Sequence, residues 1–267
     1  MSSIYFDRPD GKSSPQRAHT HVDYATAKVG NRWLERSWSR FMGTTNSLLE
    51  KEQDREWVAA NNPEFRIELS DRVLGPMELG DTDFSDTVNE LGAILTLVKS
   101  NDALTFTVQT IAFHDMPVMI RQVSLANRSD EAKLIRSISL DAFKLESDES
   151  CFLTQFFSKE HSAVLSDTDE TTVALEWDQS GFLVGRTGEA IFDLGHSAPG
   201  VCEIRSAVEK ELSPGETLTC ERTLLMPYGE SPLDFANKQI PQVMNRLKAF
   251  ETSELKKEQQ LKEEESE

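Results

Sequence analysis

The sequence predicts an all-β protein, built as a large antiparallel β-sandwich with a C-terminal helix. Three observations carry this prediction. Three strand-like segments follow one another between Leu104 and Phe143. Further short strand-like segments, separated by Gly, Pro and Asp, lie on both sides of them without interleaved helices. Near the end of the chain, the apolar residues adopt helical spacing.

The chain has 267 residues, enough for one large β domain. Residues 1–27 are expected to form a polar leader whose end reaches a sheet edge. Residues 28–230 are expected to form the sandwich, and residues 231–250 the helix. Residues 251–267 are rich in Glu and Lys, so we expect an acidic tail that does not fold alone.

The first strand-like segment of the sandwich is Asn31–Phe41. Its alternation places Leu34, Arg36, Trp38 and Arg40 on one face of a strand. Strands are also expected at residues 44–50, 56–58 and 63–69. A helix over residues 47–60 is the alternative, because Leu, Glu, Lys and Gln favour helix.

The middle of the sandwich is predicted from three segments, Leu104–Gln109, Val118–Leu125 and Leu134–Phe143. In the second of them, Arg121 shares a face with Met119, Val123 and Leu125. A cation on a mainly apolar face needs a partner. Asp141 in the next strand is the expected one, in a structural ion pair.

The last part of the sandwich is predicted from strand-like segments at residues 171–177, 182–184, 190–192, 201–208 and 217–226. The helix that follows carries a stripe of Ile240, Val243, Met244, Leu247 and Phe250. An amphipathic stripe of this kind normally packs on its own core.

Composition restricts the partners. The formal net charge of -18 disfavours nucleic acid and anionic membrane surfaces, because both bind clustered cations. No apolar segment is long enough to span a bilayer, and no signal peptide is visible. Cys151, Cys202 and Cys220 are widely spaced, which fits reduced thiols in a cytoplasmic protein.

Two stretches resemble a known family. The first contains Asn31-Arg-Trp-Leu-Glu-Arg36, Gly43-Thr-Thr-Asn-Ser-Leu48 and Pro63-Glu-Phe65, and the second contains Phe113 to Arg121 and Ser137-Ile-Ser-Leu-Asp141. In order and spacing they resemble the N-terminal β-supersandwich of glycoside hydrolase family 36, the α-galactosidase group. The resemblance covers roughly residues 30–230 and implies the fold shared with galactose mutarotase.

The resemblance implies a scaffold and not a hydrolase. In that family, the catalytic aspartates lie on a (β/α)₈ barrel after the sandwich, in the motifs K-W-D-x-N and R-x-D. Glu176-Trp-Asp178 is the nearest match in this sequence, and it lacks the Lys and the Asn. The contexts of the mutarotase Glu and His are not found either, so no catalytic residue is assigned.

Candidate ligand-binding residues are few. Trp38 between Arg36 and Arg40 could stack on a sugar, and Trp177 is a second candidate, although core or rim aromatics are the simpler interpretation of both tryptophans. His19, His21 and Asp23 alternate as metal ligands could, but exposed polar side chains are the simpler interpretation. The acidic segment Asp81–Asp86 is expected to be a turn or cap and not a calcium loop. Neither a metal nor another cofactor is expected.

Three functions remain open from sequence. The first is a non-catalytic carbohydrate-binding or accessory module. The second is a sugar-active enzyme, a glycosidase or an aldose epimerase, with an unrecognised site. The third is a protein-interaction scaffold that binds a partner or itself through the C-terminal helix or a sheet edge.

Overall fold

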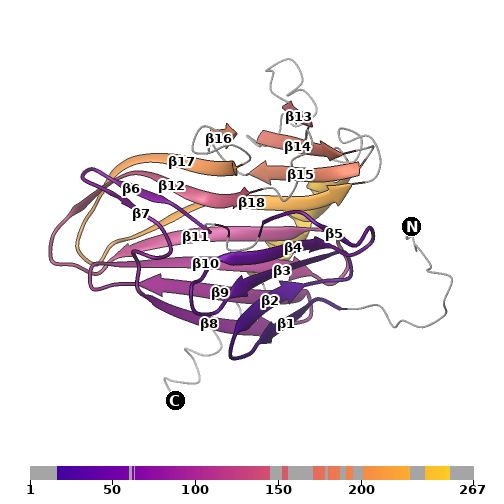
Figure 1. Cartoon of the computed structure of the whole chain (residues 1–267), viewed down its shortest axis with the longest axis horizontal. Helices are drawn as coiled ribbons and strands as arrows, with labels where there is room; N and C mark the ends of the chain where they lie inside the picture. The colour runs from indigo at the N-terminus through magenta and orange to yellow at the C-terminus, as the bar shows by residue number, and fades with distance from the viewer. Residues whose placement is uncertain are drawn as a thin grey trace.

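The computed structural model describes residues 17–59, 62, 64–144, 152–155, 171–177, 180–186, 191–194, 201–228 and 238–252. Within these residues, the chain forms three β-sheets (Figure 1) and one helix, at residues 238–252. Every pairing between named strands is antiparallel. None of the helices in this part of the chain is long and apolar enough to cross a membrane.

The largest sheet has eight strands and is called the central sheet. Its spatial order is β13 (Phe152–Gln155), β14 (Thr171–Trp177), β15 (Ser180–Arg186), β18 (Thr217–Tyr228), β11 (Met119–Asn127), β10 (Leu104–Phe113), β9 (Gly92–Ser100) and β8 (Asp81–Val88). The strands β8 to β11 are joined in sequence as hairpins, and β18 returns from the end of the chain to pair with β11.

The second sheet is a five-stranded meander called the N-terminal sheet. Its strands pair in chain order: β1 (His19–Val22), β2 (Thr26–Gly30), β3 (Leu34–Ser39), β4 (Thr45–Glu50) and β5 (Arg55–Glu56). Short loops between consecutive strands make this local pairing possible.

The third sheet is also five-stranded and is called the upper sheet from its place in Figure 1. Its order is β16 (Ile191–Leu194), β17 (Val201–Leu212), β12 (Lys133–Lys144), β6 (Ile67–Leu69) and β7 (Val73–Leu74). It combines segments far apart in the sequence, so its formation depends on long-range pairing.

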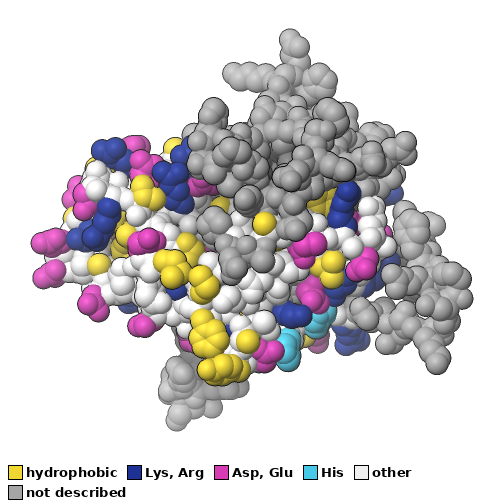
Figure 2. Space-filling view, in the orientation of Figure 1, with side chains coloured by type: hydrophobic (Ala, Val, Ile, Leu, Met, Phe, Trp, Pro, Cys, Tyr) yellow, Lys and Arg dark blue, Asp and Glu magenta, His cyan; other side chains and the backbone are white. Residues whose placement is uncertain are grey.

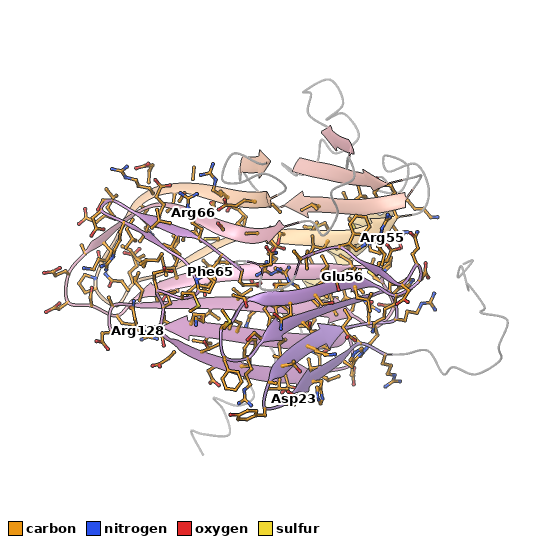
Figure 3. The ribbon with its side chains drawn as sticks, viewed as in Figure 1. Asp23, Arg55, Glu56, Phe65, Arg66 and Arg128 are labelled. Atoms are coloured by element: carbon orange, nitrogen blue, oxygen red, sulfur yellow. The ribbon has the colours of Figure 1, made fainter. Side chains whose placement is uncertain are left out.

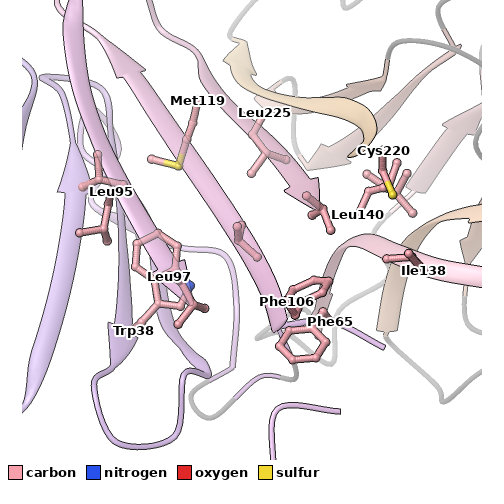
Figure 4. Packing of buried hydrophobic residues seen from close by; sticks show 14 of the residues in the cluster. Trp38, Phe65, Leu95, Leu97, Phe106, Met119, Ile138, Leu140, Cys220 and Leu225 are labelled. Atoms are coloured by element: carbon pink, nitrogen blue, oxygen red, sulfur yellow. The ribbon is translucent and has the colours of Figure 1, made fainter. Parts of the chain in front are cut away.

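The main core lies between the central sheet and the two smaller sheets. Alternation along the strands turns Leu97, Phe106 and Met119 of the central sheet inward. There they join Trp38 of the N-terminal sheet and Ile138 of the upper sheet in one hydrophobic cluster (Figure 4). The three sheets therefore share a single core.

The opposite face of the central sheet carries a second core, and the helix at residues 238–252 covers it. Ile240, Val243, Leu247 and Phe250 of the helix pack with buried residues of the sheet that include Phe113 and Leu224. The predicted stripe thus packs on the helix's own sheet. It is occupied within the chain and is not presented to a partner.

The predicted fold class is confirmed: an antiparallel β-sandwich with one helix. The alternative helix over residues 47–60 is wrong, because β4 and β5 occupy this region. The acidic segment Asp81–Asp86 is not a turn but part of edge strand β8. β1 begins within the segment expected to be a leader and forms a sheet edge. Residues 1–16 and 253–267 lie outside the described residues.

Candidate functional site

The most concentrated group of charged side chains lies inside the molecule. Arg36 of β3, Glu64 before β6, Arg121 of β11 and Asp141 of β12 are each at most 1% exposed. Their four side chains form what we call the buried charge cluster. It takes members from all three sheets, and its formal charges cancel.

Arg36 holds one side of this cluster. Its Nη1 donates to Asp141 Oδ2 and its Nη2 to Asp141 Oδ1, each at 3.0 Å, in a two-pronged pair. Nη2 also donates to Glu64 Oε2 at 3.1 Å, and Nε donates to Thr45 Oγ1 at 3.1 Å. The Thr45 hydroxyl donates in turn to Glu64. One guanidinium therefore connects both acids.

Arg121 closes the cluster from the central sheet. It donates through Nη2 to Glu64 Oε1 and forms an ion pair with Asp141 through Nη1. Its cross-strand neighbours, Thr110 of β10 and Thr223 of β18, are also buried. The guanidinium therefore reaches the acids from the middle of the central sheet.

The cluster perturbs the pKa values of its members. Burial disfavours the charged form of Arg36, but Asp141 and Glu64 outweigh it, so the pKa of Arg36 is raised. Burial and then the neighbouring Arg36 cation lower the pKa of Arg121. Burial opposes ionisation of Asp141, but Arg121 and Arg36 together hold its pKa below the usual value. The raised pKa of Arg36 and the lowered pKa of Asp141 both favour the charged pair, whereas the lowered pKa of Arg121 reflects the cost of burying a second guanidinium beside the first.

The buried charge cluster connects the three sheets, and a substrate cannot reach its side chains. Each acid binds both arginines, and none of the four side chains is exposed. A buried pair of this kind is strongly destabilising to break, because the remaining partner stays buried without compensation. We therefore describe the cluster as an inter-sheet tie.

The structure brings together three of the predicted residues, Arg36, Arg121 and Asp141, but Arg36 is in a different role. It was expected on a sugar-binding face and instead belongs to the buried charge cluster. Trp38 is 1% exposed and packs beside Phe84, with a 6.5 Å distance between ring centroids. The expected stacking of Trp38 on a sugar is therefore corrected, because its ring is covered by the core.

The other two candidates lie elsewhere. Arg40 is half-buried near the surface, where its Nη1 donates to the Asp23 backbone oxygen at 2.8 Å. Trp177 ends β14 opposite Ser180, and its side chain lies outside the described residues. Among the three candidates whose side chains the structure describes, Arg36, Trp38 and Arg40, only Arg40 is within reach of solvent.

Sequence reasoning missed Glu64 and Thr45. Glu64 falls within the strand predicted over residues 63–69, but β6 begins only at Ile67, so the alternation expected there does not set the direction of its side chain. A signal was nevertheless available. Arg36 and Arg121 both alternate with apolar residues, so two buried cations required two buried anions, and Asp141 supplied one.

The residues that carry the family resemblance have structural roles in this protein. Asn31 Nδ2 donates to the backbone oxygens of Phe113 and Met116, while its Oδ1 accepts from the Trp33 and Leu34 amides. Arg36, Arg121 and Asp141 form the cluster. The short motifs therefore mark positions that assemble the sandwich.

The alternating His19, His21 and Asp23 do not converge. His19 Nε2 lies 3.2 Å from Glu35 Oε2, and His21 Nε2 lies 3.1 Å from Asp23 Oδ2. In the part of the chain that the structure describes, no three His, Cys, Asp or Glu side chains are grouped to hold a metal ion.

No protein-family model matches the sequence, and no curated protein matches it. Solved structures do match the fold. The galactosidase domain of an α-galactosidase–sucrose kinase aligns with a TM-score of 0.51 and 9% identity, over 80% of this chain and 42% of that chain. A family 36 α-galactosidase from Geobacillus stearothermophilus gives 0.49 and 11%, over 80% and 41%. A galactose mutarotase related enzyme from Lactobacillus acidophilus gives 0.47 and 11%, over 80% and 98%.

The first of these matches has a TM-score of 0.51 and covers 80% of this chain. Its low identity restricts the comparison to architecture. The chain thus adopts a large antiparallel β-sandwich, the fold that it shares with part of this galactosidase domain.

Proposed function

We propose that this protein is a non-catalytic carbohydrate-binding or accessory module. The observation that carries the proposal is the fold shared with a galactosidase domain. The alignment covers 42% of the length of that domain. A sandwich of this type offers broad sheet faces and hairpin loops on which a sugar can rest. The resemblance of the Asn31 and Asp141 segments to an α-galactosidase scaffold points in the same direction.

The buried charge cluster supports the non-catalytic part of the proposal. A reaction on a sugar ring needs carboxyl groups that reach the substrate. The carboxylate oxygens of Glu64 and Asp141 instead pair with Arg36 and Arg121, and both acids are fully buried. These two buried acids thus serve the fold.

Calorimetric titration tests the proposal. The purified protein is titrated with methyl α- and β-galactosides and glucosides, and the same preparation is assayed for glycosidase and mutarotase turnover. We expect heat of binding for at least one glycoside and no turnover. Turnover that copurifies with the protein would establish the sugar-active enzyme instead. If the protein shows no binding and no turnover, the protein-interaction scaffold is the function that remains.

A cytoplasmic location is part of the same proposal. Cys220 is a free, buried thiol, and burial raises its pKa to about 12. Such a thiol packs as a small apolar side chain and resists oxidation. This suits a protein kept in a reducing compartment, and fractionation of the source cells would test it.

A further inference from the structure

Two aromatic side chains are exposed on neighbouring turns of the N-terminal sheet. Tyr24, between β1 and β2, is 80% exposed, and Phe41, between β3 and β4, is 61% exposed. Their ring centroids are 5.1 Å apart and their planes meet at 74°. We call them the aromatic corner. Figure 3 places the adjacent Asp23 at the lower rim, where Figure 2 shows hydrophobic side chains on the surface.

The turn that carries Tyr24 is held by its neighbours. Asp23 Oδ1 accepts from the Ala25 and Thr26 amides at 2.8 and 2.7 Å. Arg40, next to Phe41, then joins the two turns: its amide donates to Ala25 O at 2.9 Å and its Nη1 to Asp23 O at 2.8 Å. The two rings are therefore supported by one hydrogen-bonded frame.

The turn that carries Phe41 is held from below by Lys99 of β9. Lys99 is 2% exposed, and its Nζ donates to Thr82 Oγ1 at 2.6 Å, Gly80 O at 3.2 Å and Met42 O at 3.4 Å. Thr82 Oγ1 in turn donates to Phe41 O at 3.2 Å. Gly43 has φ +66°, and a Cβ there would lie 2.9 Å from Lys99 Cδ. A buried cation thus fixes an exposed loop.

Ordered, exposed aromatic rings are well suited to the apolar face of a sugar. Two coplanar rings would form a flat strip for a chain of sugars, whereas rings at 74° form a corner for one. One ring can stack on the face of a pyranose while the other contacts its edge. A guanidinium carries five donors, and Arg40 uses one on Asp23, so Arg40 can also donate to a hydroxyl.

The size of the corner argues against a protein partner. Two aromatic side chains expose roughly 300 Å² together, whereas a stable protein interface buries about 800 Å² on each partner. The charge of the surroundings further restricts the ligand. Asp23, Asp81, Asp83 and Asp86 lie on these turns and on β8, and the chain as a whole is acidic. Uronic acids and sugar phosphates would be repelled.

We infer that the aromatic corner of Tyr24 and Phe41, with Arg40 beside it, binds a single neutral pyranose ring. The ligand is a monosaccharide glycoside or the terminal unit of a longer sugar. Lys99 acts as a positioning residue that holds the Phe41 turn. This inference rests on the proposed function, since it assigns the site to the carbohydrate-binding activity.

Saturation-transfer NMR with methyl α-galactoside and methyl α-glucoside tests the site on the full chain. The variants are Tyr24→Ala, Phe41→Ala and Lys99→Met, and galacturonic acid is the anionic probe. Met77→Ala is the matched control, because Met77 is 66% exposed on a different loop. We expect the two alanine variants to weaken binding at least about tenfold. Lys99→Met should weaken it by about threefold or more and increase amide exchange at Met42 and Gly43.

The outcomes separate the two proposals. Loss of binding in Tyr24→Ala and Phe41→Ala, with Met77→Ala unchanged, supports the corner. Glycoside binding that persists in both alanine variants overturns the corner and leaves the module function standing. No glycoside binding by the wild-type protein at tens of millimolar overturns both. Binding of galacturonic acid as tight as that of methyl galactoside overturns the neutral-ligand assignment.

Discussion

The buried charge cluster and the aromatic corner draw on the same hairpin, yet they reverse the usual distribution of residues. Arg36, in the middle of β3, is fully buried, whereas Phe41, in the turn after it, is 61% exposed. β3 lies inside the N-terminal sheet between β2 and β4, so its inward side chains Leu34, Arg36 and Trp38 are covered by the core, charged or not. The turn projects beyond the layers, so an apolar ring there meets water. Whether a side chain is buried therefore depends more on its position in the layers than on its residue type. Substitutions at sites of decreasing burial should have decreasing effects on stability.

The largest effect is expected in the cluster. Arg121→Met should lower the free energy of unfolding by about 3–5 kcal/mol, because Glu64 and Asp141 lose a buried counter-charge. Urea denaturation provides the measurement. Arg128→Met is the matched control, since Arg128 is exposed at the end of the same strand region. A Glu64→Gln and Arg121→Met double variant should lose less than the sum of the two. A loss below about 1 kcal/mol for Arg121→Met would contradict the tie.

The second-largest effect on stability is expected in the apolar contact between the helix and the central sheet. Leu247 is 2% exposed in the second core, so Leu247→Ala should cost roughly 2–4 kcal/mol through lost contacts and a cavity. Lys248→Ala, one residue further on the exposed side, should be nearly neutral. Thermal unfolding would compare them. If both cost the same, the helix does not pack on the sheet as described.

An intermediate effect is expected at the half-buried Glu35. His19 leads the interactions that lower its pKa, with Lys51 and Lys28 adding to them and burial opposing, so that its pKa falls to about 2. A lowered carboxyl pKa contributes stability above the unfolded value near 4.3, which is lost as the pH falls toward 2. Glu35→Gln should cost roughly 1–2 kcal/mol at pH 7.

That cost should shrink between pH 4.5 and pH 3, because Glu35 takes up a proton in the unfolded wild-type chain while it stays mostly ionised in the folded one. Urea melts of wild type and variant at pH 7, 4.5 and 3 would follow the difference. Glu131→Gln serves as control, because Glu131 forms an exposed pair with Lys133. A gap that stays constant down to pH 3 would show that Glu35 is not held as a carboxylate by its neighbours.

The smallest effect on stability is expected at the corner. Tyr24→Ala and Phe41→Ala should each change the free energy of unfolding by less than about 0.5 kcal/mol, because their rings remain largely in water. Their effect belongs to ligand binding. Destabilisation comparable to that of Leu247→Ala would mean that these rings support the fold and would remove the contrast with the cluster.

Periodicity explains which parts of this molecule were predictable. Alternation placed Arg121 with Met119 and Val123 on one face, and this face is the inner one. The same alternation put Trp38 beside Leu34 and Arg36, and it indicated burial more reliably than the common use of Trp in sugar binding. The strands β10, β11, β12 and β14 follow the predicted segments closely. Strands that are buried on one side carry a period-two signal strong enough to be read.

Turns and edges lack that signal. Phe41 and Glu64 fall within the predicted strands at residues 31–41 and 63–69, but β3 ends at Ser39 and β6 begins at Ile67, so the alternation expected there does not apply to them. β8 contains Asp81, Asp83 and Asp86, residues of low strand propensity, and it was taken for a turn. Charged residues on an edge strand discourage pairing with other chains, so an unfavourable composition is tolerated there. The candidate binding site combines two turns and was therefore beyond sequence reasoning.

The chain distances inside the buried charge cluster affect how the protein is made. Arg36 and Asp141 are 105 positions apart, and Glu64 and Arg121 are 57 apart. While translation has reached β11 but not β12, the nascent polypeptide holds both guanidinium groups and one of the two acids. Two cations then share one acid, so one positive charge of the cluster stays uncompensated until β12 has left the ribosome. Assembly is therefore expected to be late and concerted, and not stepwise from the N-terminus.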